Sequence, residues 1–212
     1  MNLGNLNPGG RKGRVPALAS QRKYCPYCGE EVETFVMLTE GEEQLHCFIC
    51  SSPLAEEAPA AAAFKALETI LVAEDSAVFR EVLKDKLVEK DLTKNAVMAG
   101  NGEEFLTIFT NRLFRSQPIS LCILDIRMPV FNGVNAAMAL RSIEKGFERP
   151  RKTPILFFST LKCDDALKEV LRFTTPSRYI NKGASDSPDE LADRLVEVIQ
   201  RLITEGGKTA RR

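Results

Sequence analysis

Two pairs of cysteines near the N-terminus have the spacing of a metal site. Each pair is a Cys-x2-Cys motif, in CPYCG and CFICS, and 18 residues separate the pairs. The four thiols are those of Cys25, Cys28, Cys47 and Cys50. Each short turn directs two thiolates at one ion, and four thiolates complete the tetrahedral shell of Zn²⁺. The intervening residues partly alternate in polarity and turn at Glu40-Gly41, so we predict a zinc ribbon over residues 25–54. Its fold should depend on the metal, because so short a unit cannot build an adequate core.

The other readings of the cysteine and histidine residues are weaker. A redox Cys-x-x-Cys protein expects one pair in a thioredoxin-like setting rather than two pairs. His46, the only histidine, adjoins the second pair. Four cysteines already complete a tetrahedron, however, so we place His46 on an exposed hairpin. Cys122 falls in an apolar run and is expected to be a small core residue. Cys163 is expected near the surface and is given no role.

A second group of reactive side chains stands where apolar runs end. TILVA stops at Glu74-Asp75, ISLCILD at Asp125 and PILFFS at Ser159, while SRYIN is followed by Lys182. One acid or serine in such a place is ordinarily a helix cap or turn former. A matched set of acids, a hydroxyl and an amine is not explained in that way. The carboxyl ends of parallel strands share one edge of a sheet, where ligands and chemistry collect.

The elements that would position this set alternate between strand and helix. We expect strands over 69–73, 95–100, 119–125, 154–159 and 177–181. We expect the first helix to bury Val78, Val82, Leu83 and Leu87, and later helices to cover 102–115, 134–147, 164–172 and 188–204. Strands that are apolar throughout are typical of a parallel sheet with helices on both faces. The predicted fold class is therefore doubly wound α/β.

Residues 68–204 resemble the receiver domain of bacterial two-component response regulators. The resemblance rests on the paired acids Glu74-Asp75, AxNGxE at 99–104, DxxMPxxxG starting at Asp125, and the later Ser159 and Lys182. It implies the flavodoxin-like fold, with a five-stranded parallel sheet in the strand order 2-1-3-4-5.

The resemblance also implies a chemistry, in which Asp125 accepts a phosphoryl group from a sensor histidine kinase or phosphotransfer protein. Three neighbouring carboxylates repel one another, and a hard divalent cation such as Mg²⁺ relieves the repulsion. The implied Mg²⁺ ligands are Glu74, mostly through a water, Asp75, Asp125 and the backbone carbonyl of Arg127. Lys182 would neutralise the transferring oxygens. Ser159 and Tyr179 would form the family's switch.

Two residues depart from the family's usual pattern. Gly183 follows Lys182 where a proline after a cis peptide bond is usual, and a non-prolyl cis bond costs about 2.5–4 kcal/mol. The isomer at this bond, and with it the placing of Lys182, is left open by the sequence. Thr160 follows Ser159 where alanine is common, which would alter water access and the lifetime of the phosphate.

Composition and charge suggest where the chain works. It has 212 residues, no net charge and no apolar run near the roughly 18 residues of a membrane span. The N-terminus lacks the apolar core of a signal peptide, so we expect a cytoplasmic protein with reduced thiols and no membrane insertion. Flanking segments are expected to be a flexible basic arm (1–24), an Ala/Pro-rich linker (55–67) and a tail (205–212).

The predicted function is a phosphorylation-controlled switch whose receiver catalyses only its own phosphorylation and dephosphorylation. Its output would run through contacts with an unknown protein, either by the ribbon as a docking module or by the face of the last two helices and the fifth strand. The ribbon carries six Glu and no Lys or Arg, so it should repel nucleic acid. The alternative is a nucleic-acid-binding regulator that uses the basic arm. A third reading is a scaffold that no longer turns over phosphate.

Overall fold

A five-stranded parallel sheet forms the larger part of the protein. The computed structural model describes residues 22–39, 42–54, 65–183 and 187–209. The sheet order is β5-β4-β6-β7-β8, with every neighbouring pair parallel, so the predicted order 2-1-3-4-5 is confirmed. The strands are β4 (Ile70–Ala73), β5 (Ala96–Ala99), β6 (Leu121–Asp125), β7 (Ile155–Ser159) and β8 (Ser177–Asn181).

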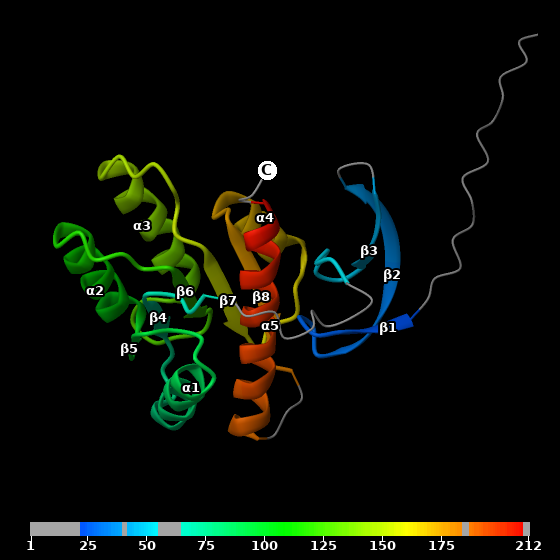
Figure 1. Cartoon of the computed structure of the whole chain (residues 1–212), viewed down its shortest axis with the longest axis horizontal. Helices are drawn as coiled ribbons and strands as arrows, with labels where there is room; N and C mark the ends of the chain where they lie inside the picture. The colour runs from blue at the N-terminus through cyan, green and yellow to red at the C-terminus, as the bar shows by residue number, and fades with distance from the viewer. Residues whose placement is uncertain (1–21, 40–41, 55–64, 184–186, 210–212) are drawn as a thin grey trace, which may run out of the picture.

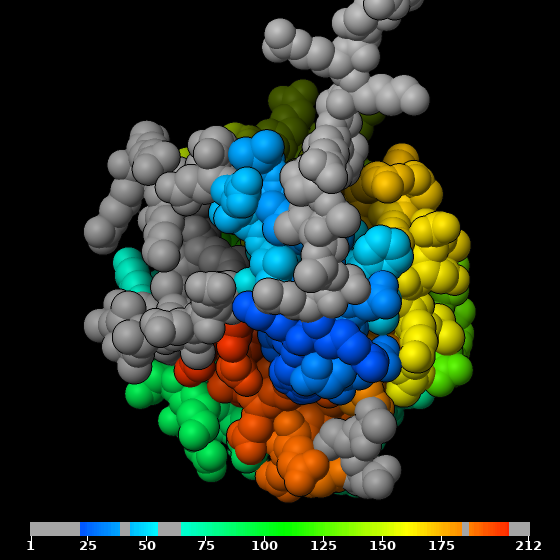
Figure 2. Space-filling view, turned by 90° about the vertical axis from the view of Figure 1, so that its right-hand side faces the viewer, coloured from blue at the N-terminus to red at the C-terminus, as the bar shows by residue number. Residues whose placement is uncertain are grey.

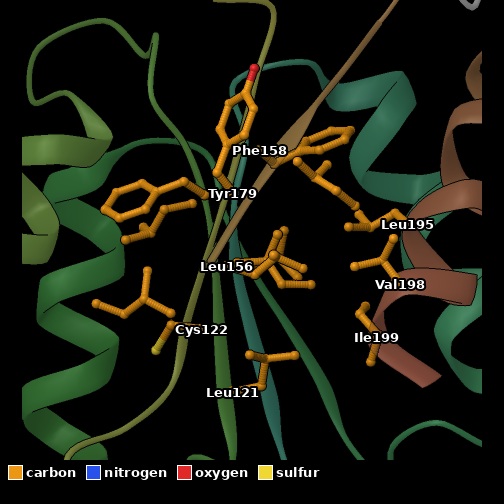
Figure 3. Packing of buried hydrophobic residues seen from close by; sticks show 14 of the residues in the cluster. Leu121, Cys122, Leu156, Phe158, Tyr179, Leu195, Val198 and Ile199 are labelled. Atoms are coloured by element: carbon orange, nitrogen blue, oxygen red, sulfur yellow. The ribbon is translucent and has the colours of Figure 1, made fainter. Parts of the chain in front are cut away.

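Helices cover both faces of this sheet. They are α1 (Ala77–Glu89), α2 (Gly102–Phe114), α3 (Gly133–Gly146), α4 (Asp165–Phe173) and α5 (Pro188–Thr209). α1 and α5 pack together on one face and α2 and α3 on the other (Figures 1 and 3). α5 is longer than the predicted 188–204. No helix in the described ranges is long and apolar enough to span a membrane.

Capping residues fix where the first four helices begin. Ser76, Asn101, Asn132 and Asp164 each accept, through a side-chain oxygen, the backbone N–H three residues further on. A cap of this kind satisfies a donor that the first helical turn leaves unpaired. Each helix can therefore start a few residues after a strand ends.

The core lies between the two layers of helices and the sheet. All residues of β4, β6 and β7 are buried, as expected for strands covered on both faces. Leu195, Val198 and Ile199 of α5 point at the sheet in Figure 3. Val78 was predicted to lie in the core but is 67% exposed. The buried stripe of α1 instead begins at Phe79 and continues at i+4 spacing. Val78 lies about 100° round the helix from Phe79 and therefore faces outward.

The N-terminal part is a small antiparallel sheet of β1 (Arg22–Cys25), β2 (Glu30–Thr39) and β3 (Glu42–Cys47), in that order. β2 and β3 pair antiparallel as a hairpin does. β1 begins at Arg22, inside the segment predicted to be a flexible arm. The rest of that arm (1–21) and most of the linker (55–64) lie outside the described residues.

This small sheet does not stand apart from the parallel sheet. Figures 1 and 2 show it against α4, β8 and α5, the elements that end the chain. Its buried residues, including all four cysteines of the two pairs, belong to the same buried cluster as the larger core.

Candidate functional site

The carboxyl edge of the parallel sheet gathers three acids. Carboxylate oxygens of Glu74, Asp75 and Asp125 all lie within 4.8 Å of one another. Glu74 is 2% exposed and Asp125 5% exposed, whereas Asp75 lies open to solvent. Charged carboxylates at such spacing repel, and an all-oxygen donor set with one side open to water suits Mg²⁺. The donor set therefore fits the metal that the sequence suggests.

Lys182 reaches this acid cluster from the end of β8. Its Nζ lies 2.5 Å from Oδ2 of Asp125 and 2.7 Å from Oε2 of Glu74. The ammonium also lies 4.9 Å from the ring centre of Phe158, which stacks on Phe79. Burial raises the pKa of Glu74, and the positive charge of Lys182 opposes that rise. An amine held between two carboxylates in an apolar setting can neutralise an anion that binds there.

The turn after β6 explains why a buried strand ends on an acid. The backbone N–H of Arg127 donates to Oδ1 of Asp125 at 2.9 Å, which fixes the carboxylate. The chain then returns so closely that the N–H of Gly133 donates to the carbonyl of Ile126. A Cβ at Gly133 would lie 2.0 Å from the carbonyl oxygen of Asp125. The glycine of DxxMPxxxG thus allows α3 to begin against the strand end.

Replacing Gly133 with alanine is therefore expected to destabilise the fold. The clash involves backbone on both sides, so we expect a loss of about 1–3 kcal/mol or more, as for other overpacked sites. Gly146, at the other end of α3, has nothing within 4 Å of its Cβ position and provides the matched control. Alanine there should be neutral or stabilising by up to about 1 kcal/mol. Urea unfolding of both variants checks this, and equal stabilities would contradict it.

Ser159 and Tyr179, the two predicted switch residues, meet through one loop residue. Oγ of Ser159 accepts the N–H of Leu161 at 3.1 Å. The Tyr179 hydroxyl donates to the carbonyl of Leu161 and accepts from the Asn181 amide. Tyr179 is already buried, and burial raises its pKa. Thr160 is exposed and accepts a hydrogen bond from the guanidinium of Arg127.

The chain after Lys182 takes a path that proline could not take. Thr175-Pro176 is the only cis peptide bond among the described residues, so the bond to Gly183 is trans. Gly183 has φ of +67°, whereas a proline ring fixes φ near −65°. Asn181 also contributes here, since its Oδ1 accepts the N–H of Gly183. Sequence reasoning passed over Asn181; its place as the polar last residue of the strand, directly before Lys182, was the available signal.

The four paired cysteines converge as the sequence predicts. Their Sγ atoms lie within 4.8 Å of one another, with Cys25 to Cys50 at 3.8 Å and Cys28 to Cys47 at 3.7 Å. Zn–S bonds of about 2.3 Å in a tetrahedron place sulfurs about 3.8 Å apart, so the spacing fits zinc. Backbone N–H groups of Cys28 and Cys50 each point at the sulfur three residues earlier, at 3.4 Å.

Two residues near this cluster differ from the sequence-based expectation. His46 is not on an exposed surface: it is 5% exposed, and its Nδ1 lies 2.9 Å from the carbonyl oxygen of Ser51. The loop of the second cysteine pair folds back over β3 and covers the ring. Cys163 is also buried, and burial, reinforced by the charge of Cys50, raises its pKa to about 12. Cys163 comes from the parallel-sheet part and belongs to the same buried cluster as the four paired cysteines.

Known proteins resemble this chain over the parallel-sheet part. Residues 70–195 match the family described as response regulator receiver domain. The protein named "Probable transcriptional regulator ycf27" from Porphyra purpurea is 31% identical over 140 residues, which cover 63% of this chain and 48% of that protein. The "Protein-glutamate methylesterase/protein-glutamine glutaminase" of Idiomarina loihiensis is 27% identical over 143 residues, 64% of this chain and 34% of its own length. The match thus spans less than half of either curated relative.

One solved structure supports the fold alone. A mutant of the receiver domain of the histidine kinase CKI1 from Arabidopsis thaliana aligns with a TM-score of 0.52 at 18% identity. The alignment covers 66% of this chain and 92% of that domain.

Proposed function

The chain belongs to the response regulator receiver domain family, since residues 70–195 of its 212 match that family, and from this premise we propose that it is a switch controlled by phosphorylation of Asp125. The phosphoryl donor would be a sensor histidine kinase or a phosphotransfer protein. The single observation that supports the assignment best is the amine of Lys182 held between Asp125 and Glu74.

The proposed reaction forms an aspartyl-phosphate. One carboxylate oxygen of Asp125 attacks the phosphorus atom while the bond from phosphorus to the donor's imidazole nitrogen breaks. Lys182 would then bind a phosphoryl oxygen in place of the Asp125 carboxylate oxygen that it now contacts. The ligands for Mg²⁺ would be Glu74, Asp75, Asp125 and the carbonyl of Arg127, and the ion would neutralise charge on the transferring group. The receiver's own chemistry would be limited to this step and its hydrolysis.

The signal would leave the site through the loop after β7. A phosphoryl oxygen on Asp125 would attract the hydroxyl of Ser159 away from the N–H of Leu161. The carbonyl of Leu161 in turn holds the hydroxyl of Tyr179. Movement of the serine would therefore be felt at the tyrosine through one shared residue, which gives a local charge a route to the surface.

The four cysteines would hold one structural Zn²⁺, and the ribbon would serve as a docking module for an output protein. Support comes from the sulfur spacing and from the large apolar side chains that the ribbon leaves exposed, among them Leu38 and Phe48. Exposed apolar side chains of this kind are typical of protein contacts. A protein partner is preferred over nucleic acid because the ribbon carries six Glu and no Lys or Arg. The alternative, nucleic-acid binding by the basic arm, concerns residues that lie mostly outside the described ranges.

Incubation with acetyl phosphate and Mg²⁺, followed by intact mass measurement, tests the proposed function. We expect a gain of one phosphoryl group per chain, which disappears when Mg²⁺ is omitted and is removed by hydroxylamine, as an acyl phosphate should be. A gain that resists hydroxylamine would place the phosphate on a hydroxyl group instead. No gain in the zinc-loaded protein, with either acetyl phosphate or a histidine-phosphorylated donor, would contradict the proposal.

A further inference from the structure

The first cysteine turn of the ribbon is joined to the residue before Lys182. The backbone N–H of Asn181 donates to the carbonyl oxygen of Tyr27 at 2.6 Å, and Tyr27 is 1% exposed. On the other side of β8, the N–H of Lys182 donates to the carbonyl of Ser159 at 2.6 Å. β8 is an edge strand, whose outward N–H groups would otherwise face water. The backbone that carries Lys182 is thus held from both sides.

Arg194 of α5 links the same two segments. Its guanidinium donates to the carbonyl oxygen of Asn181. A Cβ at Gly29 of the ribbon would lie 2.3 Å from its Nη1, and one at Gly183 would lie 2.6 Å from the same atom. Both glycines have positive φ, +74° and +67°. The guanidinium therefore fills the space between two glycine turns, one beside the cysteines and one beside the lysine.

The ribbon also touches the loop that follows Ser159. Cys163 of this loop is buried in the same cluster as the four paired cysteines of the ribbon. Lys162 pairs with Glu30 at 3.3 Å, a surface contact that contributes little energy by itself. The loop after β7 and the chain at the end of β8 therefore both contact the ribbon. The carbonyl of Leu161 connects these two segments, since it accepts from the hydroxyl of Tyr179 and from the amide of Asn181.

We propose that the metal-loaded cysteine turn of the ribbon positions Lys182, with Arg194 as the positioning residue between them, so that zinc occupancy sets the rate at which Asp125 is phosphorylated. This inference rests on the proposed function. Without the ion, nothing holds the four thiols of so small a unit together, and the turn that presents Tyr27 and Gly29 loses its shape. Lys182 then keeps its side-chain partners but loses the backbone contacts on the ribbon side.

The expected effect is large because reactive groups tolerate little displacement. A misplacement of about 1 Å can cost up to about a hundredfold in rate. Coupling between two equilibria is also reciprocal: if zinc stabilises the phosphorylated state relative to the unphosphorylated one, phosphorylation tightens zinc binding by that same equilibrium factor, which need not equal the change in rate. Couplings of this kind are commonly about 5- to 150-fold.

The test compares full-length protein in zinc-loaded form and after treatment with a zinc-selective chelator that leaves Mg²⁺ in place. The rate of phosphoryl gain from acetyl phosphate is measured for wild type, Arg194→Ala and the control Arg172→Ala, an exposed arginine of α4. We expect wild type and the control to slow by roughly tenfold on zinc removal. Zinc-loaded Arg194→Ala should be as slow as zinc-free wild type and should slow no further.

The change in zinc affinity on phosphorylation distinguishes a positioning role of Arg194 from a merely structural one, which would leave that change unaltered. It is measured by competition with a chromophoric chelator, before and after phosphorylation. In wild type, phosphorylation should tighten zinc binding by at least about fivefold. In Arg194→Ala the two affinities should be equal, whereas general destabilisation would weaken both together.

Each other outcome overturns a different statement. Equal phosphorylation rates in wild type with and without zinc would overturn the inference and leave the proposed function standing. A slower rate accompanied by loss of helical circular dichroism would mean that zinc maintains the receiver's fold, which would overturn the positioning role. No phosphoryl gain with zinc bound would defeat the proposed function and the inference together.

Discussion

Asp125→Asn is expected to abolish phosphorylation of the chain by acetyl phosphate. The amide has no nucleophilic oxygen of comparable strength, and the two neighbouring acids are poor substitutes. Glu74 is buried and paired with Lys182, while Asp75 is exposed to solvent. The turn should survive, because the amide oxygen can still accept the N–H of Arg127. Intact mass and circular dichroism together should show a folded protein with no added phosphoryl group.

Asp75→Asn is the matched comparison for this variant. It removes a carboxylate of the same cluster but leaves the nucleophile in place. We expect it to accept phosphate at high Mg²⁺ and to need more Mg²⁺ for half of the maximal rate, since one charged ligand is lost. A phosphoryl group found on Asp125→Asn would mean that the acceptor lies elsewhere, and indistinguishable behaviour of the two variants would deny Asp125 a special role.

Cys47→Ser is expected to abolish the proposed zinc binding. The side chain of Cys47 lies 3.7 Å from Sγ of Cys28, and its sulfur also faces the N–H of Cys50. Loss of one of four sulfurs should weaken zinc binding by more than about a hundredfold, beyond the usual cost of altering an outer partner of a ligand. Metal analysis after dialysis should find one zinc per wild-type chain and none in the variant.

Cys163→Ser distinguishes a ligand from a buried neighbour. Cys163 is buried beside the cluster but is not among the four sulfurs that converge. The variant should therefore keep its zinc with nearly unchanged affinity. Zinc retained at full affinity by Cys47→Ser would show that the four-sulfur site is not where the metal binds, and zinc lost by Cys163→Ser would make that residue a ligand.

Much of the receiver fold could be predicted because its signals are local. Apolar runs bounded by capping residues mark each strand and helix, and β8 has the predicted bounds of 177–181. The convergence of Glu74, Asp125 and Lys182 follows from parallel strand order alone, since parallel strands end at one edge. Val78 was misplaced because two overlapping apolar stripes of α1, one through Val78 and one through Phe79, have helical spacing, and only packing against the sheet decides which of them is buried.

The joint between the ribbon and the receiver could not be predicted. The contact of Tyr27 with Asn181 and the place of Arg194 involve segments more than a hundred residues apart in sequence, with no periodicity or motif in common. Gly29 and Gly183 were visible in the sequence. What makes both necessary is one guanidinium between them, and only the fold brings that group to the two turns. The burial of His46 depends on the loop of the second cysteine pair, and that of Cys163 on segments distant in sequence, so neither could be predicted.

Sharing one arginine between two glycine turns limits how the two parts can be recombined. A ribbon fused to another receiver would not pack against it unless that receiver had an arginine at this place in its last helix and a glycine after its lysine. Conversely, a side chain at either glycine would push the guanidinium into the other turn. If the proposed coupling holds, the ribbon and receiver of this chain are not interchangeable modules, and a transplanted half would not bring the zinc-dependent regulation with it.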